Sequence, residues 1–229
     1  MKKTTVAAVV AAMALPLGGQ VLAQDTGFFS DTYLRASVAQ VDYDVDFVDV
    51  GVDLVLGKTT GFTLVGGYQH SPFVSFELGY YNLGEVSDSI PVSYSYGDAM
   101  VGFEIEGEST FKVETSGSTF GASVRLHTDN GKPFYGGALV GYQRWNLEYR
   151  NKIVDNYRLN TYDLVGNSVG VESGTLINRF KESRSGNDPF YGLFVAWVTP
   201  VGEFGLEYTV FEVDGEKPKL LGASYAYRF

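Results

Sequence analysis

The last twelve residues constrain the fold of this chain most, because they alternate between two kinds of side chain and end on an aromatic residue. In an extended strand, one face would carry Leu221, Ala223, Tyr225, Tyr227 and Phe229, and the other small or polar side chains. A period of two predicts a β-strand. About eleven residues can cross a bilayer at a tilt, with an apolar outer face and aromatic residues at the interface. The sequence therefore predicts a transmembrane strand at residues 218–229.

Residues 1–23 have the organisation of a signal peptide. Lys2 and Lys3 precede an apolar run at residues 5–17, and Ala23 follows small or aliphatic residues of the kind that signal peptidase reads. A membrane-spanning helix is disfavoured, because the apolar run has about thirteen residues where about twenty are needed. We therefore expect residues 24–229 to form one β-barrel domain.

Composition excludes several classes of protein. Without the two lysines of the signal peptide, 15 basic residues remain against 27 acidic ones, a net charge of −12. That charge is incompatible with the basic surface that holds nucleic acid. The chain has no cysteine, so it forms no disulfide and no thiolate metal site. We expect no cofactor.

The alternation predicts eight strands in all. They lie at residues 31–39, 61–69, 73–83, 118–126, 134–147, 189–198, 204–213 and 218–229. The third is the clearest, since Phe76 and Leu78 share one face while Ser75 and Glu77 share the other. In residues 134–147 the alternation does not decide which side chains share a face.

The connections alternate between long and short. Residues 41–58, 84–114 and 150–187 are long, with extra strand expected within 84–114, and 150–187 is the longest loop. Short turns are expected at residues 70–72, 129–133 and 199–202, where Asn130-Gly131 is a strong turn signal. This pattern predicts an all-β fold, an eight-stranded antiparallel transmembrane β-barrel with long extracellular loops.

Isolated charges distinguish this barrel from a soluble one. Glu77, Arg125 and Glu207 sit among small residues, which favours a polar interior. The alternative, a soluble ligand carrier, would place bulky apolar residues inside and charges outside.

Several segments resemble the OmpA-type outer-membrane barrel. They are Gly66-Gly67-Tyr68-Gln69, Phe76-Glu77-Leu78-Gly79-Tyr80, Thr199-Pro200, Leu206-Glu207-Tyr208 and the terminal Ser224-Tyr225 with Tyr227-Arg228-Phe229. The resemblance implies the barrel without the peptidoglycan-binding domain of the larger members, a plan similar to the OmpX-like proteins. It also implies that Phe229, Tyr227 and Tyr225 are read by the barrel assembly machinery.

The same resemblance implies a cluster of buried charges inside the barrel. Glu77, Arg125 and Arg35 fall at three positions of that cluster. Its other two positions fall on Val195 and Gly205, so the cluster is expected to be incomplete. Glu207 and Arg228 are the candidate replacements.

The case for catalysis or metal binding is weak. His70 and His127 lie at predicted periplasmic turns, and Asp129 stands where lipid A deacylases carry a serine nucleophile, so we expect no enzyme. Asp42, Asp44 and Asp46 form a weak Ca²⁺ candidate that lacks the spacing of a dedicated loop. Solvated acids are the simpler interpretation.

We therefore expect a protein of the cell outer membrane with a structural or surface role, in envelope integrity or loop-mediated adhesion. Its expected partners are membrane lipid, lipopolysaccharide and host or environmental ligands. A solvated surface is the default interpretation of the basic residues of the longest loop, and contact with phosphates or a glycan is the alternative: Arg150, Lys152, Arg158, Arg179, Lys181 and Arg184. The alternatives are a small low-conductance channel or solute conduit and a lipid A-modifying enzyme.

Overall fold

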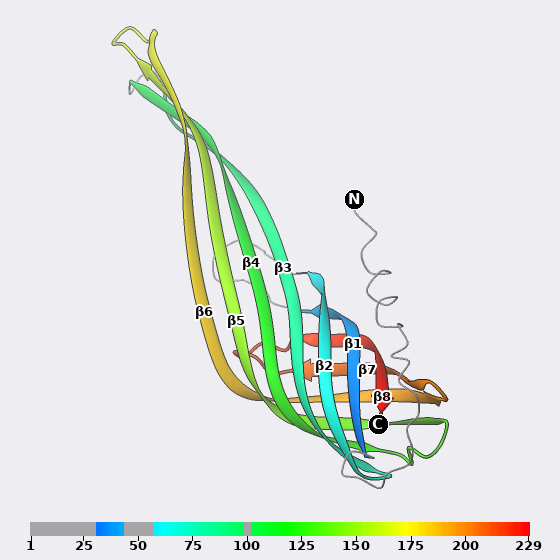
Figure 1. The fold of residues 1–229 in the computed structure, drawn as a ribbon. Helices are drawn as coiled ribbons and strands as arrows, with labels where there is room; N and C mark the ends of the chain where they lie inside the picture. Colours follow the sequence, from blue (N-terminus) through cyan, green and yellow to red (C-terminus); the bar gives the residue numbers. More distant parts are fainter. Residues whose placement is uncertain (1–30, 44–56, 99–101) are drawn as a thin grey trace.

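The computed structural model describes residues 31–43, 57–98 and 102–229, which form a closed antiparallel barrel of eight strands (Figure 1). The strands are β1 (Thr32–Asp42), β2 (Lys58–Ser71), β3 (Val74–Asp98), β4 (Phe103–His127), β5 (Phe134–Tyr162), β6 (Ser168–Thr199), β7 (Gly202–Phe211) and β8 (Lys219–Arg228). Each strand pairs with its neighbours in sequence, and β8 closes the ring on β1. The predicted fold class is confirmed. The predicted signal peptide, residues 1–23, lies outside the described residues.

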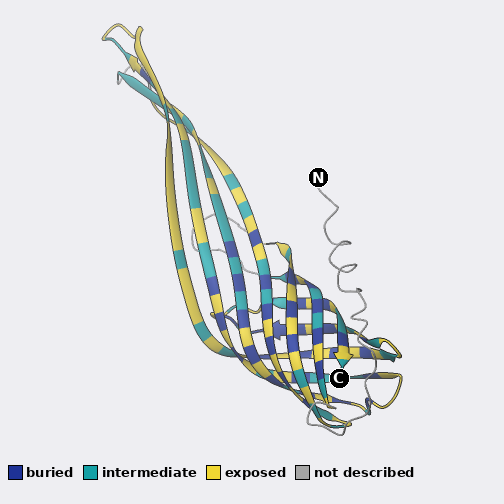
Figure 2. Ribbon diagram, viewed as in Figure 1, coloured by how far each residue is buried: buried dark blue, intermediate teal, exposed yellow. Residues whose placement is uncertain are grey.

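Alternation of side chains builds the barrel wall. On β1, Tyr33, Arg35 and Ser37 point inward and are buried, while Leu34 points outward and is exposed. The alternating bands of buried and exposed residues continue around the ring (Figure 2). The structure also fixes the phase of residues 134–147 of β5, because Tyr135, Leu139, Gln143, Trp145 and Leu147 are buried there.

Four strands continue far beyond the ring. β3 to β6 run on as a curved four-stranded sheet, whereas β1, β2, β7 and β8 end near the barrel rim (Figure 1). We call residues 86–98, 103–115, 149–162 and 168–182 the projecting sheet. In this sheet β3 pairs with β4, β4 with β5 and β5 with β6.

The projecting sheet corrects one prediction and sharpens another. The expectation of a long loop at residues 150–187 is wrong, because all but residues 163–167 lie in β5 and β6, which pair with each other along this length apart from a bulge near the tip. The extra strand expected within residues 84–114 is confirmed, and it occupies nearly all of that segment. Pairing on both sides gives the inner strands of the sheet a full ladder of backbone hydrogen bonds, which a solvated loop lacks.

The two faces of the projecting sheet continue the two surfaces of the barrel wall. Its inner face carries Val86 and Thr115, which are buried like the interior side chains below them. Its outer face continues the exposed wall. No helix among the described residues is long and apolar enough to cross a membrane.

Candidate functional site

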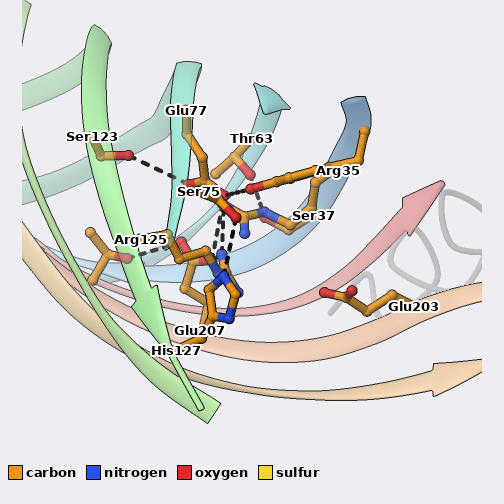
Figure 3. Close-up of polar contacts among 12 residues, drawn as sticks. Arg35, Ser37, Thr63, Ser75, Glu77, Ser123, Arg125, His127, Glu203 and Glu207 are labelled. Carbon is orange, nitrogen blue, oxygen red and sulfur yellow. Dashed lines mark hydrogen bonds and ion pairs between the residues drawn. The ribbon is translucent and has the colours of Figure 1, made fainter. Parts of the chain in front are cut away.

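Four charged side chains from four strands meet inside the barrel. Arg35 of β1, Glu77 of β3, Arg125 of β4 and Glu207 of β7 form what we call the charge ring (Figure 3). The Nη2 atom of Arg35 lies 3.0 Å from Glu77 Oε2 and 3.4 Å from Glu207 Oε2. Arg125 Nη1 lies 3.5 Å from Glu77 Oε1 and 3.2 Å from Glu207 Oε2. Each arginine therefore contacts both glutamates, and the ring is neutral overall.

Neighbouring groups hold the charge ring in place. Tyr33 donates a hydrogen bond to Glu77 Oε1 at 2.5 Å, and Ser123 donates one to Glu77 Oε2 at 3.4 Å. Thr209 donates to Glu207 Oε1 at 3.2 Å. The Arg125 guanidinium lies 3.3 Å from the centroid of the Phe194 ring, a cation–π contact. Buried charges persist only when they are paired and hydrogen-bonded in this way.

A second polar layer lies toward the end of the barrel that carries the short turns. Arg228 forms an ion pair with Glu203 at 2.9 Å and donates hydrogen bonds to Tyr135 and Gln69. His127 Nε2 lies 3.1 Å from Ser75 Oγ. This layer lies below the charge ring, so two polar layers cross the barrel one above the other.

An apolar plug fills the barrel on the other side of the charge ring. The rings of Tyr81, Phe190 and Phe211 pack together with centroids 5.2–5.5 Å apart, and each ring is almost completely buried. The other members are Ala39, Val41, Tyr43, Val65, Leu83, Val86, Leu139, Trp145, Leu147, Val213 and Leu220. The expectation of a polar interior is therefore wrong for this half of the barrel. Large rings fill it because β3, β6 and β7 present them at the same height.

The resemblance to the OmpA-type barrel implied two further positions of the cluster, at Val195 and Gly205, and the structure places them on opposite faces of the wall. Val195 points outward and is exposed, because Phe194 and Ala196 occupy the inward phase of β6. Gly205 shares the inward phase of β7 but contributes no side chain. Glu207, two residues further along β7, supplies the second acid, so the charge ring has two acids and two bases.

Sequence reasoning missed Glu203 and Tyr135, which form the second polar layer with Arg228. A signal was present for Glu203, because it shares the inward phase of β7 with Glu207. Arg228 belongs to this layer and, among the residues that the structure describes, forms no ion pair with a member of the charge ring, whereas Glu207 is part of that ring. The two candidate replacements therefore lie at different heights.

The aromatic residues at the carboxy-terminus lie on the outer wall. The rings of Tyr227 and Phe229 pack edge to face with centroids 5.4 Å apart, and both side chains are exposed. Tyr225 donates a hydrogen bond to the carbonyl of Val201 at 2.5 Å, and its ring lies 5.2 Å from that of Phe204. This end of β8 thus presents a continuous aromatic surface.

The described part of the chain gives little support to metal binding. Asp42 lies opposite Lys58 and forms an exposed ion pair with it at 3.6 Å. Asp44 and Asp46 lie outside the described residues. No cluster of three metal-ligating side chains occurs among the residues that the structure describes.

The outer face of the projecting sheet carries a row of basic residues. Lys112, Lys152 and Arg179 lie directly opposite one another on β4, β5 and β6. Lys112 pairs with Glu114, whereas Lys152 and Arg179 form no ion pair within the described part of the chain. Like charges placed opposite each other repel. A bound anion would therefore reduce the electrostatic repulsion among the side chains of this cationic row.

Beside the cationic row, Glu148 forms ion pairs with two cations. Lys181 Nζ lies 2.7 Å from Glu148 Oε2, and Arg150 contacts Oε1. These contacts, that of Lys181 first, lower the pKa of Glu148 below its usual range. The hydrogen bond from Lys112 likewise lowers the pKa of Glu114. Both acids stay ionised at neutral pH and offset part of the local positive charge.

No family model and no curated protein matches the sequence. The solved structures with a similar arrangement of strands include Neisserial surface protein A, at 15% identity over 87% of this chain and 98% of that one, with a TM-score of 0.39. Ail, the attachment invasion locus protein of Yersinia pestis, in complex with the heparin analogue sucrose octasulfate, has 14% identity over 86% and 96% and a TM-score of 0.35. The N-terminal β-barrel domain of Pseudomonas aeruginosa OprF has 10% identity over 86% and 98% and a TM-score of 0.30. These TM-scores are low, so the fold assignment rests on the strand pairing of this chain itself.

Proposed function

We propose that this protein is a non-conducting barrel of the cell outer membrane that anchors the projecting sheet at the cell surface for adhesion or recognition. The single observation that carries this proposal is the filled interior, in which the charge ring and the apolar plug occupy the cross-section of the barrel. Eight strands leave an interior that side chains can fill. A rigid, closed barrel that supports a long sheet suits an anchor better than a channel.

The outer wall supports a membrane location. It exposes a belt of apolar side chains, in which Leu78, Phe120, Leu193, Trp197 and Leu206 are more than half exposed. An apolar hollow of about 1030 Å³ on this wall is lined by side chains such as Phe76 and Leu78. β1 and β8 have 11 and 10 residues, the length that a tilted strand needs to cross the hydrocarbon. The terminal Phe229, Tyr227 and Tyr225 would be read by the barrel assembly machinery.

The positive charge of the cationic row suits an anionic partner. Lys112, Lys152 and Arg179 lie on the face that continues the lipid-facing wall, above the apolar belt. We propose that phosphate groups of lipopolysaccharide bind there. Charge reversal in Lys152→Glu should weaken retention of lipopolysaccharide at low salt, whereas Arg158→Glu, which lies opposite Glu106, should change it little.

Conductance and surface labelling test the main proposal together. The refolded chain should give no steady conductance in planar bilayers. The chain lacks cysteine, so single cysteines report topology without background. On intact cells a membrane-impermeant maleimide should label Ser173→Cys in the projecting sheet, and it should label Gly131→Cys in a short turn only after permeabilisation. Steady ion flow would favour the channel, and labelling of Gly131→Cys on intact cells would reverse the orientation.

A further inference from the structure

The projecting sheet has one apolar and one polar face. The inner face carries four rows of opposed residues near its tip: Tyr96, Ile105, Leu159 and Glu172; Tyr94, Gly107, Tyr157 and Gly174; Val92, Ser109, Asp155 and Leu176; Ile90, Phe111, Ile153 and Asn178. The outer face carries mainly serine, glutamate, lysine and arginine in the intervening rows. A sheet that is apolar on one face normally buries that face against another layer.

The inner face has no covering layer above the barrel rim in the described part of the chain. Below the rim the same face is covered by the apolar plug, which Tyr149 contacts. Above the rim β1, β2, β7 and β8 have ended, and Tyr96, Leu176 and Phe180 are each more than half exposed. Exposed apolar surface of this extent marks an interaction site.

Charges on the inner face lie mainly at its margins. Asp88 and Glu172 belong to β3 and β6, the edge strands of the sheet. The central Asp155 accepts hydrogen bonds from Tyr94 at 2.8 Å and from Ser109 at 2.9 Å. An apolar centre with a polar rim is the usual anatomy of a protein–protein interface.

Two tyrosines on this face lie across opposed glycines. A Cβ added at Gly107 would come 2.4 Å from Tyr94 Oη, and one added at Gly174 would come 2.6 Å from Tyr157 Oη. Both rings therefore occupy the space that a neighbouring side chain would fill. Sheets that pack face to face interdigitate the side chains of their facing surfaces, so aromatic rings placed in this way can pack against a second sheet.

The area of the inner face matches what a stable dimer needs. Residues 88–98, above the buried row of Val86 and Thr115, give a length of roughly 36 Å, and four strands give a width of roughly 19 Å, so the free part of the face covers about 700 Å². A stable interface buries about 800 Å² on each partner. A second copy supplies an identical face, so its apolar centre would meet an apolar centre in an isologous contact.

We propose that the inner face of the projecting sheet is a homodimer interface, in which the inner faces of two copies pack against each other. The dimer requires no bound lipopolysaccharide and does not alter the charge ring inside the barrel. It can therefore fail while the proposed anchor function stands, and the reverse also holds.

Photo-crosslinking in detergent-free vesicles tests the dimer. Leu176 and Ile177 are adjacent and similarly exposed, but they lie on opposite faces of β6. The full chain carrying Leu176→Cys or Ile177→Cys is labelled with benzophenone maleimide, reconstituted into phospholipid vesicles and irradiated. Leu176→Cys should give a dimer on a boiled gel, with a yield at least about tenfold above that of Ile177→Cys, because the probe lies inside the interface.

A charge placed in the apolar centre supplies the second arm. Adding Phe111→Lys to the Leu176→Cys chain should remove the crosslinked dimer, whereas Thr110→Lys, on the outer face of the same strand, should keep it. Equal heat-dependent gel shifts show that every variant has folded. Equal yields at positions 176 and 177 would overturn the proposal. So would lipid adducts at position 176 without a dimer, because lipid would then cover the inner face.

Discussion

Neutralising Glu77 is the most informative perturbation of the barrel interior. Its carboxylate lies 3.0 Å from Arg35 Nη2 and 3.5 Å from Arg125 Nη1, and its side chain is fully buried. Glu77→Gln keeps the shape but leaves two guanidinium groups with Glu207 as the one remaining acid of the ring. Breaking a buried ion pair from one side costs about 3–5 kcal/mol, so we expect the free energy of unfolding to fall by that amount.

Removing one arginine as well should restore much of the free energy of unfolding that Glu77→Gln loses. In Glu77→Gln with Arg35→Met, the pair Arg125–Glu207 remains, with its atoms 3.2 Å apart, and the ring is neutral again. We expect the double variant to lose less free energy of unfolding than the sum of the two single losses, by at least about 2 kcal/mol. Glu77→Gln with Glu207→Gln should instead lose more than either single variant, because both arginines then lack a carboxylate in the ring.

Urea unfolding in lipid vesicles measures these differences, followed by tryptophan fluorescence and by the heat-dependent gel shift. The control is Glu108→Gln, an exposed change on the outer face of the projecting sheet that should alter stability by less than about 0.5 kcal/mol. Strictly additive losses in the charge-matched double variant would refute the reasoning, because the four groups would then act independently.

Three further predictions concern other parts of the molecule. Hydrogen bonds from Asn167, its backbone N–H first, lower the pKa of Asp163, so the order of the β5–β6 turn should persist above the pKa of an unfolded aspartate. That order should be lost as the pH falls through the lower folded pKa, and hydrogen exchange should find this pH dependence absent in Asp163→Asn. Phe190→Ala with Phe211→Ala should open a cavity and cost about 3–5 kcal/mol per ring in urea unfolding; a variant of unchanged stability would contradict the role of the apolar plug. Gly107→Val should displace the tyrosine ring above it and speed amide exchange in the projecting sheet while the heat-dependent gel shift stays unchanged.

The local alternation of side chains was enough to find the strands of the barrel and most of their faces. It failed for β5, because large apolar residues occupy both of its faces: Val140 and Tyr142 point outward, while Trp145 and Leu147 belong to the apolar plug. It was also insufficient at residues 150–187. Alternation is present there in Lys152, Ile153 and the residues that follow, but basic residues and glycines weakened the signal.

What the sequence by itself determined is the strand pattern, since a period of two follows from the geometry of each extended segment alone. It also supplied the exposed aromatic end of β8. Only the tertiary structure decided that Arg35, Glu77, Arg125 and Glu207 form one ring, because their common height depends on the register of strands far apart in the chain. It likewise decided that the apolar plug ends at the barrel rim, and that no other layer of the described residues covers the inner face of the projecting sheet. The first outcome depends on strand register and the second on which strands end early, and both are properties of the closed ring as a whole.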